Sequence, residues 1–397
     1  MTIVPNHHSN QQPCPSCHHT AFEQLLDMGS VPASGCFLPD NHHSVALYPL
    51  TFELCTHCGL VRQGYSDRPT LDYTHVNRNT KRQLPSYGQQ ILDSFHQVSD
   101  PDQLVIEVGA NDGTFLNCLA AANFRHCLGI EPSIALSASC REQGHMVETT
   151  HLNHDEALRI RQRYGPAAIV LCRHTLEHVP DPLELVIAMR SLLAEDGLLF
   201  IEVPDAQDMA VNGKGQDLWD EHLHYFTAEN LTLLVQQAGF SVERITLQDH
   251  RQSMNILCWC RPSPTKPMVD TSFDDRLKIS VAQFRQFAQK WQLRCQQLQH
   301  HAPAWPSPVI AIGASHPQSN FLLFTGLGQY IDALVDDDPH KIGKYVPLPQ
   351  PVPVISTAQL IANKPPGTIL KTAFGYDGWM NKICKPMSDQ GVHIVSL

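Results

Sequence analysis

The sequence lacks a long apolar run, a surplus of basic residues and an apolar leader segment. No stretch of its 397 residues approaches the roughly 20 apolar residues that a membrane-spanning helix requires. Lys and Arg total 28 against 39 Asp and Glu, and the resulting net charge of −11 argues against nucleic-acid binding through a basic face. Residues 1–13 are polar and carry no apolar core of a secretory signal. We therefore expect a cytoplasmic protein that binds neither membranes nor nucleic acids.

The length and composition of the chain predict several folded domains with reduced thiols. A chain of 397 residues predicts two or three domains, and 42% apolar residues are enough to form proper cores. Of the 13 cysteines, four form two C-x-x-C pairs and the others are scattered, several of them in apolar, strand-like runs. Without a secretory signal, this pattern predicts free thiols rather than disulfides.

The two C-x-x-C pairs lie in the first 70 residues, at 14–17 (CPSC) and 55–58 (CTHC). Such pairs are typical of knuckle turns whose backbone N–H groups point at thiolates, and four cysteines suit tetrahedral Zn²⁺. The alternatives are a redox dithiol or plain buried cysteines, while the symmetry of the pairs argues against His18 or His57 as ligands. We predict a structural Zn²⁺, because a complete Cys₄ shell leaves no open position for catalysis. The predicted ligands are Cys14, Cys17, Cys55 and Cys58.

A strand, a glycine turn and a helix are predicted between residues 104 and 115. The apolar run 104–108 (LVIEV) leads into the turn 109–113 (GANDG), and a second apolar run ends at Glu131. Glycines let the backbone approach a nucleotide, and an acid after the second strand holds ribose hydroxyls. The turn departs from the dinucleotide pattern G-x-G-x-x-G and is typical of sites for S-adenosylmethionine (SAM), which indicates a methyltransferase rather than a dehydrogenase; the alternative is an unliganded structural turn. The predicted cofactor-binding residues are Glu107, Gly109, Asn111, Asp112, Gly113, Glu131 and Arg173.

Strands and helices are predicted to alternate over residues 101–260, which is the pattern of a mostly parallel sheet covered by helices on both faces. A helix is expected over 182–194, begun by Asp181 and Pro182 and ended at Gly197. The predicted strands are 104–108, 126–130, 168–172, 198–203, 241–246 and 255–259.

A second α/β unit is predicted after a proline-containing linker at 261–270. Residues 273–300 have the spacing of a long amphipathic helix, and a strand with a glycine turn follows at 309–314. Later strands are expected at 330–335, 368–372 and 393–395. We predict an α/β fold: a Rossmann-like sheet of the class I SAM methyltransferase type, flanked by a small N-terminal zinc domain and a C-terminal Rossmann-like domain. The predicted domains are 1–70, 71–262 and 263–397.

Two polar segments are predicted at the carboxyl edge of the central sheet, where doubly wound sheets bind ligands. In the segment 171–179, His174 and Glu177 are candidates to face the cleft, whereas His178 has the alternative of packing under the next helix. The loop 217–226 concentrates ionisable groups. Methyl transfer to carbon needs a base and a group that stabilises the carbanion, and a His–Glu pair supplies both. The alternative for this loop is a solvated surface segment.

Taken together, the motifs resemble those of the bacterial sugar C-methyltransferases of deoxysugar pathways, over essentially the whole chain. The shared motifs, in order, are the two C-x-x-C pairs, residues 106–114 (IEVGANDGT), residues 173–178 (RHTLEH), residues 221–226 (EHLHYF) and the C-terminal segments 313–314, 335–345 and 351–354. The resemblance implies SAM-dependent methylation of a carbon beside the ketone of a nucleotide-linked 4-keto sugar. In that chemistry the proton at carbon 3 is removed to give an enolate, which attacks the methyl group.

The resemblance also places catalytic roles on individual residues. The family's Tyr-His-Glu-His run falls on residues 219–222, so Glu221 and the base, His222, carry over, and His174 lies where the family has a site histidine. The family's tyrosine is Trp219 here, which has no phenolic hydroxyl, and Asp220 replaces a histidine.

The C-terminal turn of this chain departs from the family. The family's Gly-Ala-x-x-Lys-Gly turn corresponds to residues 313–318, which lack the lysine. Two alternatives therefore stay open: a methyltransferase of the same architecture that acts on a non-sugar small molecule or natural-product intermediate, and a non-catalytic SAM-binding protein. The expected partner is a small molecule, and the expected assembly is a monomer or a weak oligomer.

Overall fold

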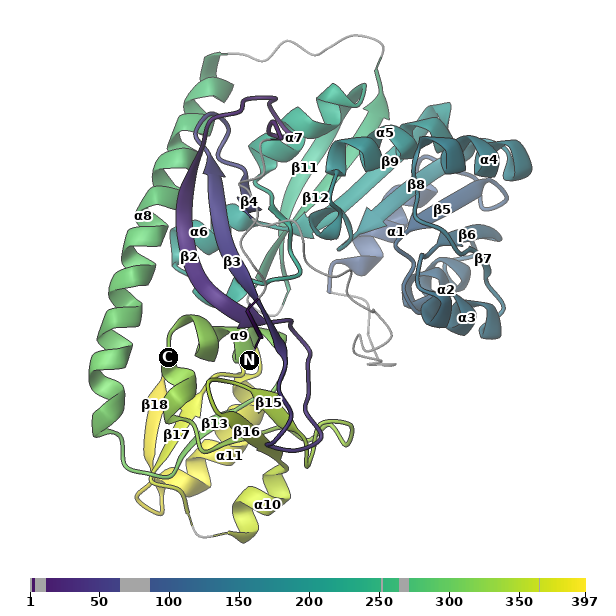
Figure 1. The fold of residues 1–397 in the computed structure, drawn as a ribbon. Coiled ribbons are helices and arrows are strands. Elements are labelled where there is room, and N and C mark those ends of the chain that lie inside the picture. The colour runs from purple at the N-terminus through teal and green to yellow at the C-terminus, as the bar shows by residue number, and fades with distance from the viewer. Residues whose placement is uncertain (1, 4–11, 65–85, 251–252, 264–270, 364) are drawn as a thin grey trace.

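The computed structural model describes residues 2–3, 12–64, 86–250, 253–263, 271–363 and 365–397, and these form three sheets joined by a long helix (Figure 1). The fold is of the α/β class with Rossmann-like sheets, as the sequence predicts. None of the helices in the described part of the chain is both long and apolar enough to cross a membrane.

The N-terminal sheet is built around a long antiparallel hairpin. Its strands are β1 (Thr2–Ile3), β2 (Phe22–Pro32), β3 (Ala46–Cys55), β4 (Val61–Gln63) and β10 (His224–Tyr225). β2 and β3 form the hairpin, β4 pairs with β3, and β10 pairs antiparallel with β4. Because β10 belongs to the loop 217–226, the N-terminal sheet holds that loop in place.

The central sheet has seven strands in the order β11-β12-β9-β8-β5-β6-β7. Its strands are β5 (Leu104–Val108), β6 (His126–Ile130), β7 (Met146–Glu148), β8 (Ala167–Arg173), β9 (Leu193–Pro204), β11 (Phe240–His250) and β12 (Ser253–Pro262). Its helices are α1 (Gly88–His96), α2 (Thr114–Ala121), α3 (Ile134–Glu142), α4 (His154–Tyr164), α5 (Pro182–Leu192), α6 (Ala206–Asn212) and α7 (Ala228–Gln237). β5 pairs in parallel with both β6 and β8, so the order of the strands reverses there, and ligands bind at such a point.

Every predicted central strand is found, but β9, β11 and β12 are longer than predicted, and one helix ends early. β5 and β6 have the predicted bounds, and Asp181 caps α5 by accepting a hydrogen bond from the backbone of Glu184. The predicted end of this helix near Ala194 is wrong: α5 ends at Leu192 because Leu193 already pairs with Ala167 of β8.

The C-terminal sheet has six strands in the order β15-β16-β14-β13-β17-β18. Its strands are β13 (Val309–Ile312), β14 (Ala333–Val335), β15 (Tyr345–Pro347), β16 (Pro351–Ile355), β17 (Thr368–Lys371) and β18 (His393–Ser396). Its helices are α9 (His316–Phe324), α10 (Thr357–Ala362) and α11 (Asp377–Ser388), and α8 (Thr271–His301) precedes them. The predicted strand 330–335 is shorter than expected, because Leu327–Tyr330 forms a 3₁₀ turn.

One apolar core joins the N-terminal hairpin, α8 and the C-terminal sheet. It contains Phe52 of β3, Phe284 and Phe287 of α8, Phe321 of α9 and Leu334 of β14, all of them buried. Figure 1 shows the hairpin lying along α8, from the central unit to the C-terminal unit. Replacing one such phenylalanine with alanine lowers the free energy of unfolding by about 3–5 kcal/mol. The packing of this core therefore determines the relative positions of the hairpin, α8 and the C-terminal sheet.

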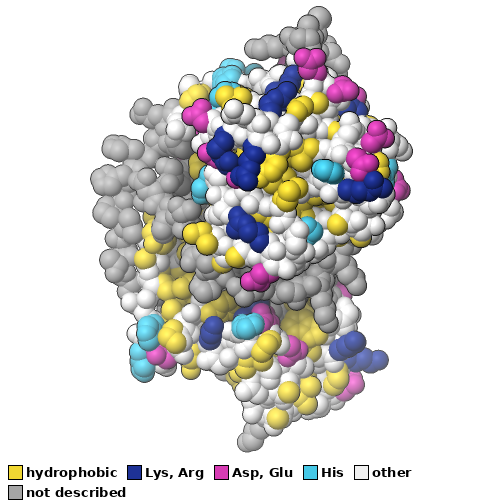
Figure 2. All heavy atoms as spheres, turned by 90° about the vertical axis from the view of Figure 1, so that its right-hand side faces the viewer, with side chains coloured by type: hydrophobic (Ala, Val, Ile, Leu, Met, Phe, Trp, Pro, Cys, Tyr) yellow, Lys and Arg dark blue, Asp and Glu magenta, His cyan; other side chains and the backbone are white. Residues whose placement is uncertain are grey.

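The face of the molecule in Figure 2 carries charges of both signs. Among the side chains drawn in colour, Lys and Arg lie among acidic and apolar groups rather than gathering into one patch. Ion pairs account for several of the basic side chains in the central unit, such as the exposed pair of Arg125 with Asp102 and the half-buried pair of Arg159 with Glu148, each at 2.8 Å.

Candidate active site and cysteine cluster

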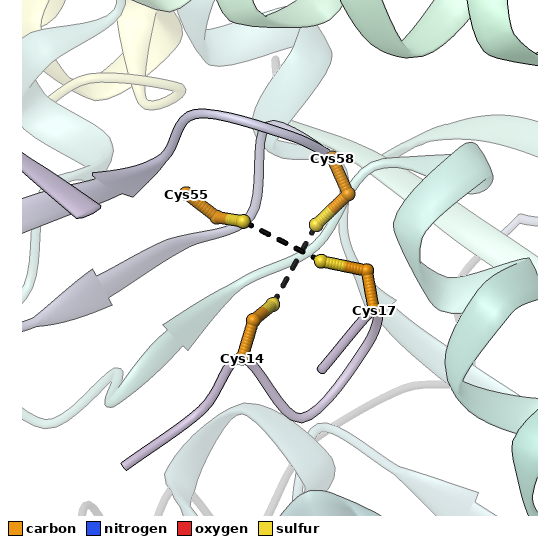
Figure 3. A group of neighbouring side chains, drawn as sticks. All are labelled: Cys14, Cys17, Cys55 and Cys58. Carbon is orange, nitrogen blue, oxygen red and sulfur yellow. Dashed lines mark hydrogen bonds between the residues drawn. The ribbon is translucent and has the colours of Figure 1, made fainter. Parts of the chain in front are cut away.

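The four predicted zinc ligands come together at one point (Figure 3). The Sγ atoms of Cys14 and Cys58 are 3.6 Å apart, those of Cys17 and Cys55 are 3.5 Å apart, and the four sulfurs all lie within 4.8 Å of one another. A disulfide would need about 2.05 Å, whereas sulfurs on a tetrahedral Zn²⁺ with bonds of about 2.3 Å are roughly 3.8 Å apart. The cluster therefore has the donor set and the size for Zn²⁺.

Each C-x-x-C pair closes a turn of the same shape. The backbone N–H of His18 donates to the carbonyl of Cys14, and that of Gly59 donates to the carbonyl of Cys55. The residue after each second cysteine has a positive φ, 59° at His18 and 73° at Gly59. His18 and His57 are not in the group of close ligand atoms, which consists of the four cysteines.

The predicted SAM turn follows β5 and closes against the end of β6. Gly109 and Ala110 both donate backbone hydrogen bonds to the carbonyl of Ile130. Gly109 has a φ of 78°, and a Cβ there would overlap the hydroxyl of Thr175. Gly113, with a φ of 84°, immediately precedes α2. The turn therefore needs glycine at both positions, and it lies at the carboxyl edge of the sheet, where the strand order reverses.

Two buried carboxylates flank this turn. Glu131 accepts hydrogen bonds from the backbone N–H groups of Asn111 and Ser133, each at 2.9 Å, and burial raises its pKa. Glu107 has one buried carboxylate oxygen without a hydrogen-bond partner, and burial raises its pKa to about 8. An unpartnered acceptor beside a glycine turn fits a ligand that carries cationic and hydroxyl groups, and SAM has both.

The predicted cofactor residues Asn111, Asp112 and Arg173 form hydrogen bonds within the protein. Asp112 accepts hydrogen bonds from the backbone and the hydroxyl of Thr114, so its carboxylate supports the start of α2. Asn111 has a φ of 51° and donates to Glu131 as described. Arg173 lies over the ring of Phe115 at 4.1 Å and donates to Glu202. Asp112 therefore shapes the turn, whereas Arg173 belongs to a neighbouring network.

That network is centred on Glu202 at the end of β9. The Glu202 carboxylate accepts hydrogen bonds from Arg173 Nε and from the hydroxyl of Tyr87, both at 2.6 Å. Although burial opposes its ionisation, Arg173 and His174 hold the pKa of Glu202 well below its usual range. Sequence reasoning missed Tyr87 and Glu202. An acid inside the apolar run 198–203 was the available signal, because a buried strand tolerates a carboxylate only when it is paired.

His174 lies between two carboxylates at the cleft. Its Nε2 is 3.4 Å from Glu202 and its Nδ1 is 3.7 Å from Glu177, and the side chain is 44% exposed. Loss of solvent lowers its pKa, but the carboxylates, Glu202 first, raise it to about 9. His174 is thus an imidazolium at neutral pH, which suits binding of an anion better than removal of a proton.

His222, unlike His174, is buried and has a lowered pKa. Its side chain is buried, and its ring centroid is 4.8 Å from that of His178 and 4.7 Å from that of Trp219. Burial and the neighbouring His178 lower the pKa of His222 to about 3, so the ring is neutral and can accept a proton. The ring of His222 is therefore neutral at neutral pH, and its role as the base stays a prediction.

The carboxylate of Glu221 is directed elsewhere. Its Oε1 is 4.0 Å from Nδ1 of His316, while its backbone carbonyl accepts a hydrogen bond from Nδ1 of His178 at 2.9 Å. The carboxylate that the structure brings next to His222 is Glu177: the ligand atoms of Glu177, His178 and His222 lie within 4.8 Å of one another.

The C-terminal unit supplies another wall of this region. Trp219 packs against His316 of α9, with ring centroids 5.5 Å apart, and its indole N–H is buried without a hydrogen-bond partner. Pro317 stands where the family has its lysine. Lys341 lies near the same turn, because it pairs at 2.8 Å with Asp336, which also accepts a hydrogen bond from the backbone of Ala314. A small cavity next to His316 is lined by Ser34, Gly35, Phe37, Ala314 and Asn320.

Comparison with known proteins identifies methyltransferase relatives. A methyltransferase domain family matches residues 77–245, and the C-methyltransferase C-terminal domain family matches residues 275–382. The chain is 25% identical over 374 residues to C-methyltransferase NovU of Streptomyces niveus, covering 89% of this chain and 87% of that protein. A shorter match of 100 residues, at 33% identity, is to ubiquinone biosynthesis O-methyltransferase of Aromatoleum aromaticum, covering 24% of this chain and 42% of that protein.

Similar solved structures include two methyltransferases. A SAM-dependent methyltransferase from Anabaena variabilis is 17% identical with a TM-score of 0.38, covering 50% of this chain and 89% of that one. Magnesium protoporphyrin IX methyltransferase from Synechocystis PCC 6803, solved with bound SAM, is 18% identical with a TM-score of 0.33, covering 44% of this chain and 79% of that one.

Proposed function

Because the chain is a SAM-dependent C-methyltransferase, we propose that it methylates the carbon beside the ketone of a nucleotide-linked deoxy-keto sugar through an enolate. The observation that carries the proposal is the buried, neutral ring of His222, which lies beside the segment 175–177. The same segment contacts the glycine turn. Thr175 lies against Gly109, and Glu177, two residues further on, reaches His222. The base and the methyl-donor turn are thereby tied to one short segment.

The proposed mechanism assigns one task to each side chain. His222 takes the proton from the carbon beside the ketone, the electron pair of that C–H bond becomes the enolate, and the enolate carbon accepts the methyl group. When bound, SAM supplies an electrophilic methyl group on a sulfonium. Glu131 is positioned for the ribose hydroxyls of the donor, and Glu107 for its cationic groups. His174, as an imidazolium, suits the developing enolate oxygen or a phosphate.

The resemblance and the chemistry of the C-terminal turn support the proposed substrate class. Lys341 brings a cation next to the backbone of the turn at Ala314, which suits a diphosphate. A second candidate is a non-sugar ketone of similar size, favoured by Trp219 in place of a tyrosine and by Pro317 in place of a lysine.

Proton exchange at carbon 3 distinguishes the two candidates. The protein is incubated in D₂O with SAM-free buffer and a panel of nucleotide-linked 4-keto sugars, and exchange is followed by NMR; methylated product is then sought by mass spectrometry with SAM present. We expect exchange and methylation with at least one sugar. Absence of exchange across the panel, together with methylation of a non-sugar ketone, would favour the second candidate.

We further propose that Cys14, Cys17, Cys55 and Cys58 hold a structural Zn²⁺, because their spacing matches a tetrahedral sulfur shell. The division into domains 1–70, 71–262 and 263–397, the cytoplasmic location and the monomeric or weakly oligomeric state stay predictions from the sequence.

A further inference from the structure

Glu177 is a buried carboxylate that the described protein leaves without a hydrogen bond. It follows β8 in the 3₁₀ turn Leu176–His178, and only 1% of its surface is exposed. Both carboxylate oxygens lack a hydrogen-bond partner, and the nearest ring nitrogen of His174 is 3.7 Å away. A buried charge without partners costs free energy, so a fold does not place one there for stability.

The carboxylate is nevertheless in its charged form. Burial raises the pKa of Glu177, but His174 and His178 bring it below its usual value. The surroundings of Glu177 thus favour the ionised carboxylate, although neither of its oxygens accepts a hydrogen bond from the described residues.

Two histidine rings lie next to the carboxylate, and of these His222 is the one able to donate a hydrogen bond to it, because the N–H of a neutral His178 ring is at Nδ1. Nδ1 of His178 must donate to the carbonyl of Glu221, because a carbonyl only accepts, and the ring is held in that orientation. His222 lies across from it at a ring angle of 74°. One ring nitrogen of each residue lies within 4.8 Å of a Glu177 carboxylate oxygen.

We propose that Glu177 is the positioning residue of the base: it orients His222 and stabilises the imidazolium that forms when His222 takes the proton from the substrate carbon. The proposal deepens the proposed function and rests on His222 as its base. One ring nitrogen of His222 receives the proton, and the N–H at the other ring nitrogen donates to the carboxylate. The two side chains become an ion pair only at that moment, so Glu177 favours the enolate step more than the resting state. The proton leaves to solvent after methyl transfer, and no further reactant is needed.

The charged and titratable groups around His222 come from several elements. They are Glu177 and His178 of the turn after β8, His174 directly after β8, Asp220 of its own loop, and Tyr225 of β10, whose ring centroid is 5.8 Å away. Of these, Glu177 has a buried carboxylate with both oxygens unpartnered, whereas Asp220 is hydrogen-bonded to Ser34 and Asn320.

Thermal unfolding of the full-length protein without substrate tests the proposal independently of the substrate. Glu177→Gln keeps the shape and removes the charge, so we expect the unfolding midpoint to rise, by about 2–4 °C. Glu184→Gln, at an exposed position of α5, is the matched control and should leave the midpoint unchanged. A lower midpoint for Glu177→Gln would mean that the carboxylate supports the fold, and would overturn the proposal.

The pH dependence of turnover tests the electrostatic role. In Glu177→Gln we expect kcat to fall by about 100-fold or more, and the acid limb of the profile to move to lower pH, because the imidazolium of His222 is no longer stabilised. Glu177→Asp keeps the charge and should retain the wild-type acid limb at a reduced rate. A profile of unchanged shape in Glu177→Gln would overturn the proposal.

Metal analysis gives a second way to overturn the proposal. A divalent ion that wild type binds in addition to the zinc of the cysteine cluster, and that Glu177→Gln loses, would do so, because a metal bound to His222 would occupy the lone pair that must accept the proton. If no keto sugar is turned over by wild type, the substrate proposal fails while the unfolding result still decides the role of Glu177.

Discussion

The side-chain amide of Asn320 donates a hydrogen bond to the carboxylate of Asp220 at 3.1 Å, across 100 positions of the chain. Asp220 also accepts hydrogen bonds from the backbone N–H and the hydroxyl of Ser34. Ser34 follows β2, Asp220 lies two residues before His222, and Asn320 belongs to α9. The loop that carries the proposed base is therefore held by the other two parts of the chain, and Asp220, 1% exposed, is the residue they share.

Removing the amide of Asn320 should loosen this three-way contact. For Asn320→Ala we expect the free energy of unfolding to fall by about 1–3 kcal/mol, because a buried carboxylate loses a hydrogen bond. We also expect kcat to fall about tenfold as His222 loses its fixed position, with SAM affinity unchanged. Urea unfolding, steady-state kinetics and calorimetry measure the three quantities. Asn363→Ala, at an exposed position after α10, is the control. Equal kcat values for Asn320→Ala and wild type would show that the contact does not position the loop.

His222→Asn should abolish turnover and leave the donor site intact. Asparagine keeps a polar group of similar reach but cannot take a proton, so we expect kcat to fall at least about 100-fold. SAM affinity, measured by calorimetry, should stay within about twofold, because the predicted SAM-binding residues lie on β5, at the end of β8 and on the turns after β5 and β6. His340→Asn, at an exposed position, controls for loss of a histidine. Normal turnover by His222→Asn would remove the base assignment.

The cysteine cluster should bind one Zn²⁺ and stabilise the N-terminal region. In Cys55→Ser the metal content should fall from about one equivalent to near zero, and the protein should unfold at lower temperature, because metal binding is coupled to folding at such sites. Cys295→Ser, on α8 outside the cluster, should keep the metal. Well-folded wild-type protein that contains no zinc by elemental analysis would contradict the assignment.

The parts of the fold that could be predicted are those with local signals. β5 and β6 have the predicted bounds because each is a mostly apolar run, buried toward its end, that a glycine turn or an acid follows. The end of α5 could not be predicted, because Leu193 forms a strand only through its pairing with Ala167.

In the candidate active site, too, only features with a local sequence signal could be predicted. The sequence indicates that His222 and the glycine turn matter, since both carry their chemistry in the residue type. It does not show that the carboxylate near the ring of His222 is that of Glu177 rather than that of Glu221. Glu177 and His222 are 45 positions apart in the sequence, and the fold brings their side chains together. The hydrogen bonds of Asp220 to Ser34 and Asn320 depend likewise on how three separate units pack.

SAM binding should release a proton at neutral pH, and Glu107 should be its source. Burial raises the pKa of Glu107 to about 8 in the folded protein, so without ligand the group keeps its proton through most of the range between its ordinary value and pH 8. The contribution of this group to stability is therefore fully present below its ordinary pKa and is lost as the pH rises through about 8. The cationic groups of SAM favour the ionised carboxylate, so affinity should increase as the pH rises from 6 to 8.

Calorimetry in buffers of different ionisation enthalpy measures this proton directly. We expect wild type to release close to one proton per SAM at about pH 7, and Glu107→Gln to release none and to bind SAM with an affinity independent of pH. Glu142→Gln, at an exposed position at the end of α3, should behave as wild type. Proton release that persists in Glu107→Gln would mean that another group titrates on binding. An affinity that is independent of pH in wild type would place Glu107 outside the donor site.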